Sequence, residues 1–118
     1  MKALVVDDNF INREVISEAL SAAGCDVESA DGGREAIARL GEHAFDVVFL
    51  DLNMPDVDGT AVYGELRKSK NNTNTKVFLV TAADESAAQA AAEAMELEGI
   101  IYKPIELDAV VDAVDRCR

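Results

Sequence analysis

Short apolar runs alternate along this chain with segments of helical periodicity, and this alternation restricts the possible folds more than any other feature of the sequence. Strands that are separated by helices are typical of α/β folds with a parallel sheet. The apolar runs predict five strands, over residues 3–6, 25–30, 44–50, 76–81 and 100–102. The segments between them predict helices over residues 9–23, 33–40, 60–68 and 84–97, and a closing helix follows the last strand.

Local signals support these helices. Asn9 is a good helix cap, and Gly24 is a typical stop signal. In the closing segment, apolar residues recur at i, i+3, i+4 and i+7, which predicts an amphipathic helix through Leu107, Val110, Val111 and Val114. The polar stretch 69–75 is interpreted as a simple connecting loop. With 118 residues, of which 49% are hydrophobic, the chain is expected to form one domain over residues 1–118.

Asp51 ends the strongest of the predicted strands and is followed at once by the turn-rich stretch 52–59. A charge at the end of a buried strand is costly unless it faces a crevice that holds solvent or a metal ion. The position therefore indicates a chemical role rather than a place in the core.

Polar residues also follow the other strands, and the carboxyl ends of parallel strands share one edge of the sheet. The residues expected to meet at this edge are Asp7, Asp8, Asp51, Thr81 and Lys103. Three adjacent carboxylates repel one another unless a divalent cation lies among them, and oxygen ligands favour Mg²⁺ or Mn²⁺ over zinc. A carboxylate beside a hard cation, a hydroxyl and an ammonium group suits phosphoryl transfer, with Asp51 as the natural acceptor.

Four motifs, taken in their order and spacing, resemble those of a known family: Val5-Val6-Asp7-Asp8, the stretch 51–59, Thr81-Ala82 and Lys103-Pro104. Together they make the chain similar, over almost its whole length, to a response-regulator receiver domain of two-component signalling. The resemblance implies a flavodoxin-like, doubly wound α/β fold with a five-stranded parallel sheet of order 2-1-3-4-5 and five helices.

The resemblance also implies roles for individual residues. Asp51 would be the phosphoacceptor, and Thr81 and Lys103 would bind oxygens of the phosphoryl group. The implied Mg²⁺ ligands are Asp7 through a water molecule, Asp8 and Asp51 directly, and Asn53 through its backbone carbonyl. The Lys103–Pro104 peptide bond would be cis.

One position departs from the family pattern. Most receivers carry an aromatic residue three positions before the lysine, where this chain has Ile100. Tyr102 either substitutes for that aromatic side chain or packs at the surface, and the sequence leaves both open. Our hypothesis is that activation reorders the loop after Thr81 and the alanine-rich helix over residues 84–97.

Two groups of polar residues are assigned to structure rather than to chemistry. Asp56 and the pair Asp58-Gly59 are expected to form the turn after Asp51 and to cap the helix that begins at Thr60. His43, the single histidine of the chain, is expected to be a solvated loop residue.

The amino-acid composition disfavours some classes of binding partner. The 23 acidic and 11 basic residues give a net charge of −12, which disfavours nucleic acids and anionic membranes as ligands. Cys25 and Cys117 lack metal-site or CxxC spacing and are expected to be reduced thiols. Neither a signal peptide nor a membrane span is evident, so a cytoplasmic protein is expected.

The expected function is a switch that takes a phosphoryl group from a histidine kinase or a histidine phosphotransfer protein, with Mg²⁺ or Mn²⁺, and signals to a further protein. It would catalyse its own phosphorylation and hydrolysis rather than act as an enzyme on other substrates. The small Ala82 and Ala83 predict slow hydrolysis. We expect a monomer, and the sequence leaves open whether phosphorylation causes dimerisation. The chain is expected to be a free-standing regulator or phosphorelay shuttle, with a module of a hybrid kinase as the alternative.

Three other functions share features with this sequence. A hydrolase with an aspartyl-phosphate intermediate usually has a second aspartate two residues after the nucleophile, where this chain has Asn53. A flavodoxin-like electron carrier needs a phosphate-binding loop after the first strand, where this chain has Asp7-Asp8-Asn9. An interaction module that does not depend on phosphorylation is the remaining alternative, and Ile100 makes it plausible.

Overall fold

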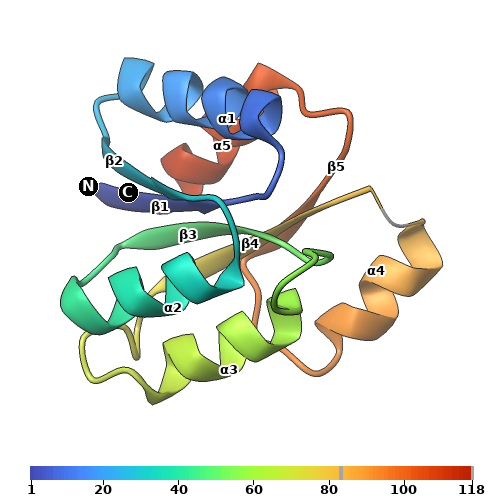
Figure 1. The fold of residues 1–118 in the computed structure, drawn as a ribbon. Helices are drawn as coiled ribbons and strands as arrows, with labels where there is room; N and C mark the ends of the chain where they lie inside the picture. Colours follow the sequence, from blue (N-terminus) through green and yellow to red (C-terminus); the bar gives the residue numbers. More distant parts are fainter. Residues whose placement is uncertain (83, 118) are drawn as a thin grey trace.

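The computed structural model describes residues 1–82 and 84–117, and its centre is a parallel β-sheet (Figure 1). The strands lie in the order β2-β1-β3-β4-β5, and every neighbouring pair is parallel. Their bounds are Lys2–Val6 for β1, Asp26–Ala30 for β2, Val47–Asp51 for β3, Lys76–Thr81 for β4 and Gly99–Tyr102 for β5. The predicted doubly wound α/β fold with strand order 2-1-3-4-5 is therefore confirmed.

Helices cover both faces of the sheet. Helices α1 and α5 lie on one face, and α2, α3 and α4 lie on the other (Figure 1). Their bounds are Phe10–Ala22 for α1, Gly33–Glu42 for α2, Gly59–Lys68 for α3, Glu85–Ala92 for α4 and Leu107–Cys117 for α5. None of these helices, which comprise all those in the described ranges, is both long and apolar enough to cross a membrane.

The ends of α1 show how local sequence sets a boundary. The side chain of Asn9 accepts a hydrogen bond from the backbone N–H of Asn12 at 3.0 Å, which satisfies one of the donors left free at a helix start. After the helix, Gly24 adopts a φ of 89°, a conformation that favours glycine and turns the chain toward β2.

The core lies in two layers, one on each side of the sheet. Strand β3 is buried along its whole length and contributes to both layers, with Phe49 on the α1 and α5 side and Leu50 on the α2 and α3 side. Phe49 stacks on Phe78 with ring centroids 5.4 Å apart. Strands buried on both faces are expected in the middle of a parallel sheet, which explains the continuous apolar run before Asp51.

Two helices differ from their predicted form. Helix α4 ends at Ala92 rather than near residue 97, because its alanines bury little surface and Ala88 is its single fully buried residue. Met95 packs beyond the helix end, in a small cluster with Leu79. In α5, the predicted Val110 and Val114 are buried together with Ala113, whereas Leu107 and Val111 are exposed at 55% and 37%.

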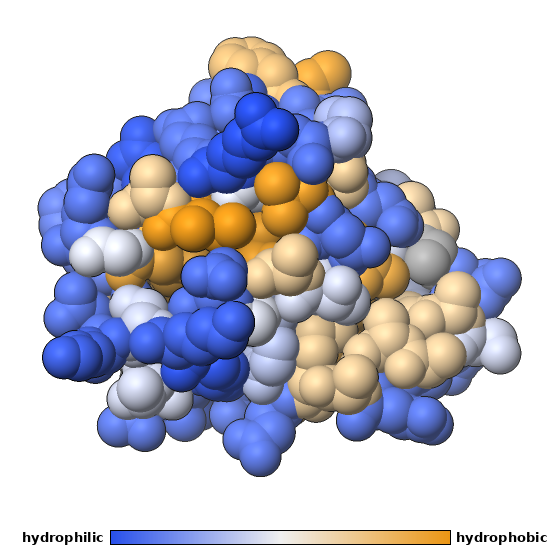
Figure 2. Space-filling view, turned by 60° about the horizontal axis from the view of Figure 1, so that its bottom comes forward, coloured by the Kyte–Doolittle hydropathy of each residue, from blue (hydrophilic) through white to orange (hydrophobic). Residues whose placement is uncertain are grey.

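The outer surface of the α2, α3 and α4 face is mixed in character. Figure 2 shows hydrophobic residues in a strip across the middle of this side, with hydrophilic residues on either side of it. A paler apolar area lies toward the α4 side, where the sequence is rich in alanine. A groove between α2 and α3 is lined by Ile37 and Leu40, with Lys68 and Lys70 beside them.

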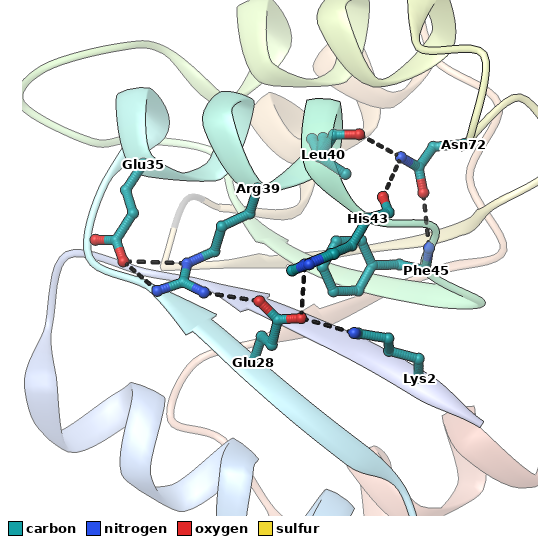
Figure 3. Close-up of polar contacts among 8 residues, drawn as sticks. All are labelled: Lys2, Glu28, Glu35, Arg39, Leu40, His43, Phe45 and Asn72. Carbon is teal, nitrogen blue, oxygen red and sulfur yellow. Dashed lines mark hydrogen bonds and ion pairs between the residues drawn. The ribbon is translucent and has the colours of Figure 1, made fainter.

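The segment 69–75 is a loop, as predicted, and it also makes structural contacts that the sequence did not predict. Asn72 is fully buried, and its side chain bonds three backbone groups (Figure 3). Its Oδ1 accepts from the N–H of Phe45 at 2.8 Å, while its Nδ2 donates to the carbonyls of Leu40 at 2.7 Å and His43 at 3.0 Å. The loop thus joins the end of α2 to the segment before β3.

A cluster of charged side chains joins β1, β2 and α2 (Figure 3). The carboxylate of Glu28 contacts Lys2 at 2.9 Å, Arg39 at 2.7 Å and His43 at 3.0 Å. The hydrogen bond from Lys2, followed by that from Arg39, lowers the pKa of Glu28 below its ordinary value. His43 is an exposed loop residue, as expected, and it also contacts an acidic partner.

Candidate functional site

Three carboxylates meet at the carboxyl edge of the sheet. Asp7 and Asp8 follow β1, and Asp51 is the last residue of β3. One oxygen atom from each of the three lies within 4.8 Å of the others. Asp7 and Asp51 are buried, with 1% and 4% exposure, whereas Asp8 is exposed. The convergence expected from the parallel sheet is therefore present.

Hydrogen bonds hold Asp7 in place. Its Oδ1 accepts from the N–H of Asn9 at 2.8 Å, and its own N–H donates to the carbonyl of Ala30 at 3.2 Å. The guanidinium of Arg13, from α1, donates to the Asp7 carbonyl at 2.8 Å. Sequence reasoning missed Arg13, because the contact depends on how α1 packs above the strand.

Lys103 extends from the end of β5 into the acidic cluster. Its Nζ lies 3.1 Å from Asp7 Oδ2 and 3.5 Å from Asp51 Oδ2. The backbone N–H of Lys103 donates to the carbonyl of Thr81 at 2.8 Å, and the Lys103–Pro104 peptide bond is cis, as the family resemblance implied. The edge therefore places one ammonium group against two of its three carboxylates.

Thr81 is the last residue of β4 and is completely buried. It follows Val80, which pairs in register with Asp51 on the neighbouring strand. The hydroxyl-bearing residue and the carboxylate thus end adjacent strands at the same edge. The residue that follows, Ala82, is exposed, and Ala83 lies outside the described residues.

The cluster carries more negative charge than its surroundings neutralise. Burial, together with the nearby charge of Asp7, raises the pKa of Asp51 from 3.8 to about 6, although Lys103 opposes the shift. Asp7 Oδ2 is buried and accepts no hydrogen bond within the described residues, although the Lys103 ammonium lies 3.1 Å away as an ion-pair partner. An all-oxygen donor set with an unsatisfied buried oxygen fits a hard divalent cation.

The segment after Asp51 forms a tight loop over residues 52–58. The N–H of Asn53 points toward Asp51 Oδ1 at 3.4 Å, and the loop closes where the N–H of Gly59 donates to the carbonyl of Leu52 at 2.9 Å. A Cβ on Gly59 would lie 2.5 Å from the carbonyl oxygen of Asp51, so this close approach requires glycine.

The two loop aspartates cap different helices. Asp58 caps α3 as predicted, since its Oδ1 accepts from the N–H of Thr60 at 2.8 Å. The carboxylate of Asp56 instead accepts from the first N–H groups of α2, at Gly33 and Arg34. Its expected role at α3 was wrong, because the loop folds back onto a helix that is distant in sequence.

The comparison with known families decides the identity. A model of the response regulator receiver domain matches residues 3–115, which include the whole acidic edge. This chain is a response regulator receiver domain.

Several curated relatives of this receiver are histidine kinases. It is 34% identical over 120 residues to the sensor histidine kinase AtsR of Burkholderia thailandensis, and the match covers 100% of the chain and 20% of that protein. It is 31% identical over 117 residues to hybrid signal transduction histidine kinase A of Dictyostelium discoideum, with 96% and 5% coverage. The first relatives that it matches are therefore much longer, and the receiver spans 4% to 20% of their lengths.

Solved receivers share the fold closely. The chemotaxis protein CheY4 of Vibrio cholerae superposes with a TM-score of 0.90 at 29% identity, covering 99% of this chain and 98% of that one. The response regulator TrrA of Thermotoga maritima, solved in complex with Mg²⁺ and BeF, has a TM-score of 0.84 at 30% identity, with 99% and 98% coverage.

The position that departs from the family pattern lies on β5. Ile100 is half-buried against the cluster that contains Leu79 and Met95, and Tyr102 is 38% exposed. Both residues line a groove between α4 and β5.

Proposed function

We propose that this receiver takes a phosphoryl group from a phosphohistidine donor onto Asp51, with Mg²⁺, and passes the signal on by protein contact in the cytoplasm. The observation that supports this most strongly is the meeting of Asp7, Asp8 and Asp51 at one edge, with Lys103 between two of them. The donor would be a histidine kinase or a histidine phosphotransfer protein.

Each residue of the edge has a distinct part in the proposed reaction. Asp8, Asp51, the carbonyl of Asn53 and, through water, Asp7 would hold Mg²⁺, or Mn²⁺ in its place. The bound ion would neutralise negative charge on the phosphoryl oxygens.

Side chains of the receiver would carry out the transfer step itself. A carboxylate oxygen of Asp51 attacks phosphorus, the bond from phosphorus to the donor imidazole nitrogen breaks, and the imidazole leaves with its electron pair. The ammonium of Lys103 and the hydroxyl of Thr81 would then contact the phosphoryl oxygens. The result is a switch that modifies itself, with slow hydrolysis expected because an alanine at position 83 offers no side chain to position an attacking water molecule.

The relatives support this proposal in two ways. TrrA, which is 30% identical, binds Mg²⁺ together with BeF. Two relatives with matching segments are named as a hybrid signal transduction histidine kinase and a sensor histidine kinase, which supports a histidine-linked donor for this receiver. They also make a place within a hybrid kinase an alternative to a free-standing regulator.

The proposal is tested by incubating the protein with Mg²⁺ and acetyl phosphate and measuring its intact mass. We expect the mass of one phosphoryl group to be added, and the gain to be lost with a chelator or in Asp51→Asn. Asp115→Asn, on the exposed side of α5, is the matched control and should be phosphorylated normally. Failure of folded wild-type protein to gain mass, even with a phosphohistidine donor, would favour the interaction module that Ile100 makes plausible.

Binding of Mg²⁺ should weaken in acid. A proton competes with the ion for the Asp51 carboxylate, whose pKa is about 6, so protonation becomes dominant below that pH. We expect the association constant to fall by about tenfold for each pH unit below 6 and to level off above 7. Calorimetric titrations with Mg²⁺ between about pH 5 and pH 8 measure this, and a constant affinity across that range would contradict it.

A further inference from the structure

Asp56 bonds two segments that are far apart in the sequence. Its carboxylate accepts from the backbone N–H groups of Gly33 at 3.0 Å and Arg34 at 3.1 Å, at the start of α2. It also accepts from the N–H of its own neighbour Val57 at 2.8 Å. The bonds from Arg34 and Gly33 lower the pKa of Asp56, so this carboxylate stays ionised at neutral pH.

The bond to α2 replaces a cap that the helix lacks. The N-cap residue of α2 is Gly32, which has no side chain to accept from the free N–H groups. Asp56, 23 residues after Gly33, fulfils that role instead. An aspartate also suits the positive end of the helix dipole.

The glycine pair allows the loop to come this close. A Cβ on Gly32 would lie 2.8 Å from Asp56 Oδ2, and a Cβ on Gly33 would lie 2.5 Å from the Cβ of Val57. The 52–58 loop therefore rests directly on the start of α2. At its base, the Gly59 N–H to Leu52 carbonyl bond at 2.9 Å closes the same loop.

We propose that Asp56 is a positioning residue for the acidic edge: its carboxylate tethers the 52–58 loop to α2 and so keeps Asn53 beside Asp51. The loop joins the phosphoacceptor to α3, and Asn53 is two residues from Asp51. Without the tether, the loop keeps its bond at the base but loses the two hydrogen bonds that join Asp56 to the start of α2. The part of this proposal that concerns Mg²⁺ rests on the proposed function, whereas the tether itself does not.

A pair of variants separates the tether from simple helix capping. Asp56→Ala removes both the cap of α2 and the tether of the loop. Gly32→Asp combined with Asp56→Ala restores a local cap but leaves the loop untethered. Gly32 has extended backbone angles that any residue adopts, and the carboxylate that would collide with its new side chain is gone. Asp56→Asn, which keeps one acceptor oxygen, serves if Asp56→Ala does not fold.

Two readouts are needed, and one requires no metal. Amide hydrogen exchange of the metal-free protein reports the order of residues 52–58, and calorimetry with Mg²⁺ reports the affinity of the site. We expect both untethered variants to lose exchange protection in the loop and to bind Mg²⁺ about tenfold more weakly, a typical effect of outer-shell changes. The double variant should regain the thermal stability that Asp56→Ala loses.

The outcomes distinguish the two proposals. Wild-type affinity and wild-type exchange in the double variant would mean that Asp56 only caps α2, and would overturn the tether. Unchanged loop exchange in metal-free Asp56→Ala would overturn it as well. A wild-type protein that binds no Mg²⁺ would contradict the proposed function instead, and the exchange measurements would then decide on the tether alone.

Discussion

Replacing Asn72 by alanine is expected to lower the free energy of unfolding by about 3–5 kcal/mol, because it removes hydrogen bonds from three backbone groups and leaves the buried N–H of Phe45 without its Asn72 partner. The side chain is completely buried and bonds the N–H of Phe45 and the carbonyls of Leu40 and His43 (Figure 3). Each buried group that loses its only partner costs about 1–3 kcal/mol, and the alanine also leaves a cavity. Since domains of this size are stable by roughly 5–15 kcal/mol, the variant would be close to unfolding.

Urea unfolding at neutral pH, followed by circular dichroism, measures this loss. Asn71→Ala is the matched control, because Asn71 is the exposed neighbour in the same loop and should change stability little. Equal stability of the two variants would show that the Asn72 network contributes nothing to the fold.

Replacing Asp51 by asparagine is expected to have the opposite effect on the metal-free protein, which should become more stable at pH 7–8 by about 1–3 kcal/mol. The pKa of Asp51 rises from 3.8 to about 6 in the folded protein, so folding favours the protonated form. The ionised carboxylate therefore destabilises the native state at any pH above about 6. Asparagine removes that charge and keeps nearly the same shape.

The stability of the wild-type protein should depend on pH in a direction that the raised pKa of Asp51 sets. Stability of the wild-type protein should fall as the pH rises from about 4 to about 6, because the native state loses its extra proton over that range. The stability gained in Asp51→Asn should accordingly vanish near pH 4. Saturating Mg²⁺ should also reduce the difference between the variant and the wild type, because the ion stabilises the wild type by binding to it. A variant that is less stable than wild type in metal-free buffer at pH 8 would contradict this interpretation of the site.

The fold and the acidic edge were predictable because their signals are local. Short apolar runs mark strands, helical periods mark the segments between them, and a parallel sheet brings the strand ends together. Asp7, Asp8, Asp51 and Lys103 follow directly from that rule, and the structure places them within a few ångströms.

The contacts that sequence reasoning did not predict join residues far apart in the chain. Asn72 bonds groups about 30 positions earlier in the chain, and Asp56 caps a helix 23 residues before it. Asp58, by contrast, caps the helix next to it and was predicted correctly. Neither of these distant bonds produces a periodic pattern in the sequence. The Gly32-Gly33 pair is the one sequence feature that reflects the close approach of the loop.

The central claim is that Asp51 carries the phosphoryl group, and trapping that group by chemistry tests it most directly. Borohydride reduces an aspartyl phosphate to an alcohol, so a phosphorylated and then reduced protein carries homoserine where the acyl phosphate stood. We predict that peptide mass spectrometry finds homoserine at position 51, in an amount that requires Mg²⁺ during phosphorylation. Homoserine at Asp7 or Asp8 instead, or a phosphoryl group on a side chain that resists reduction, would contradict the account.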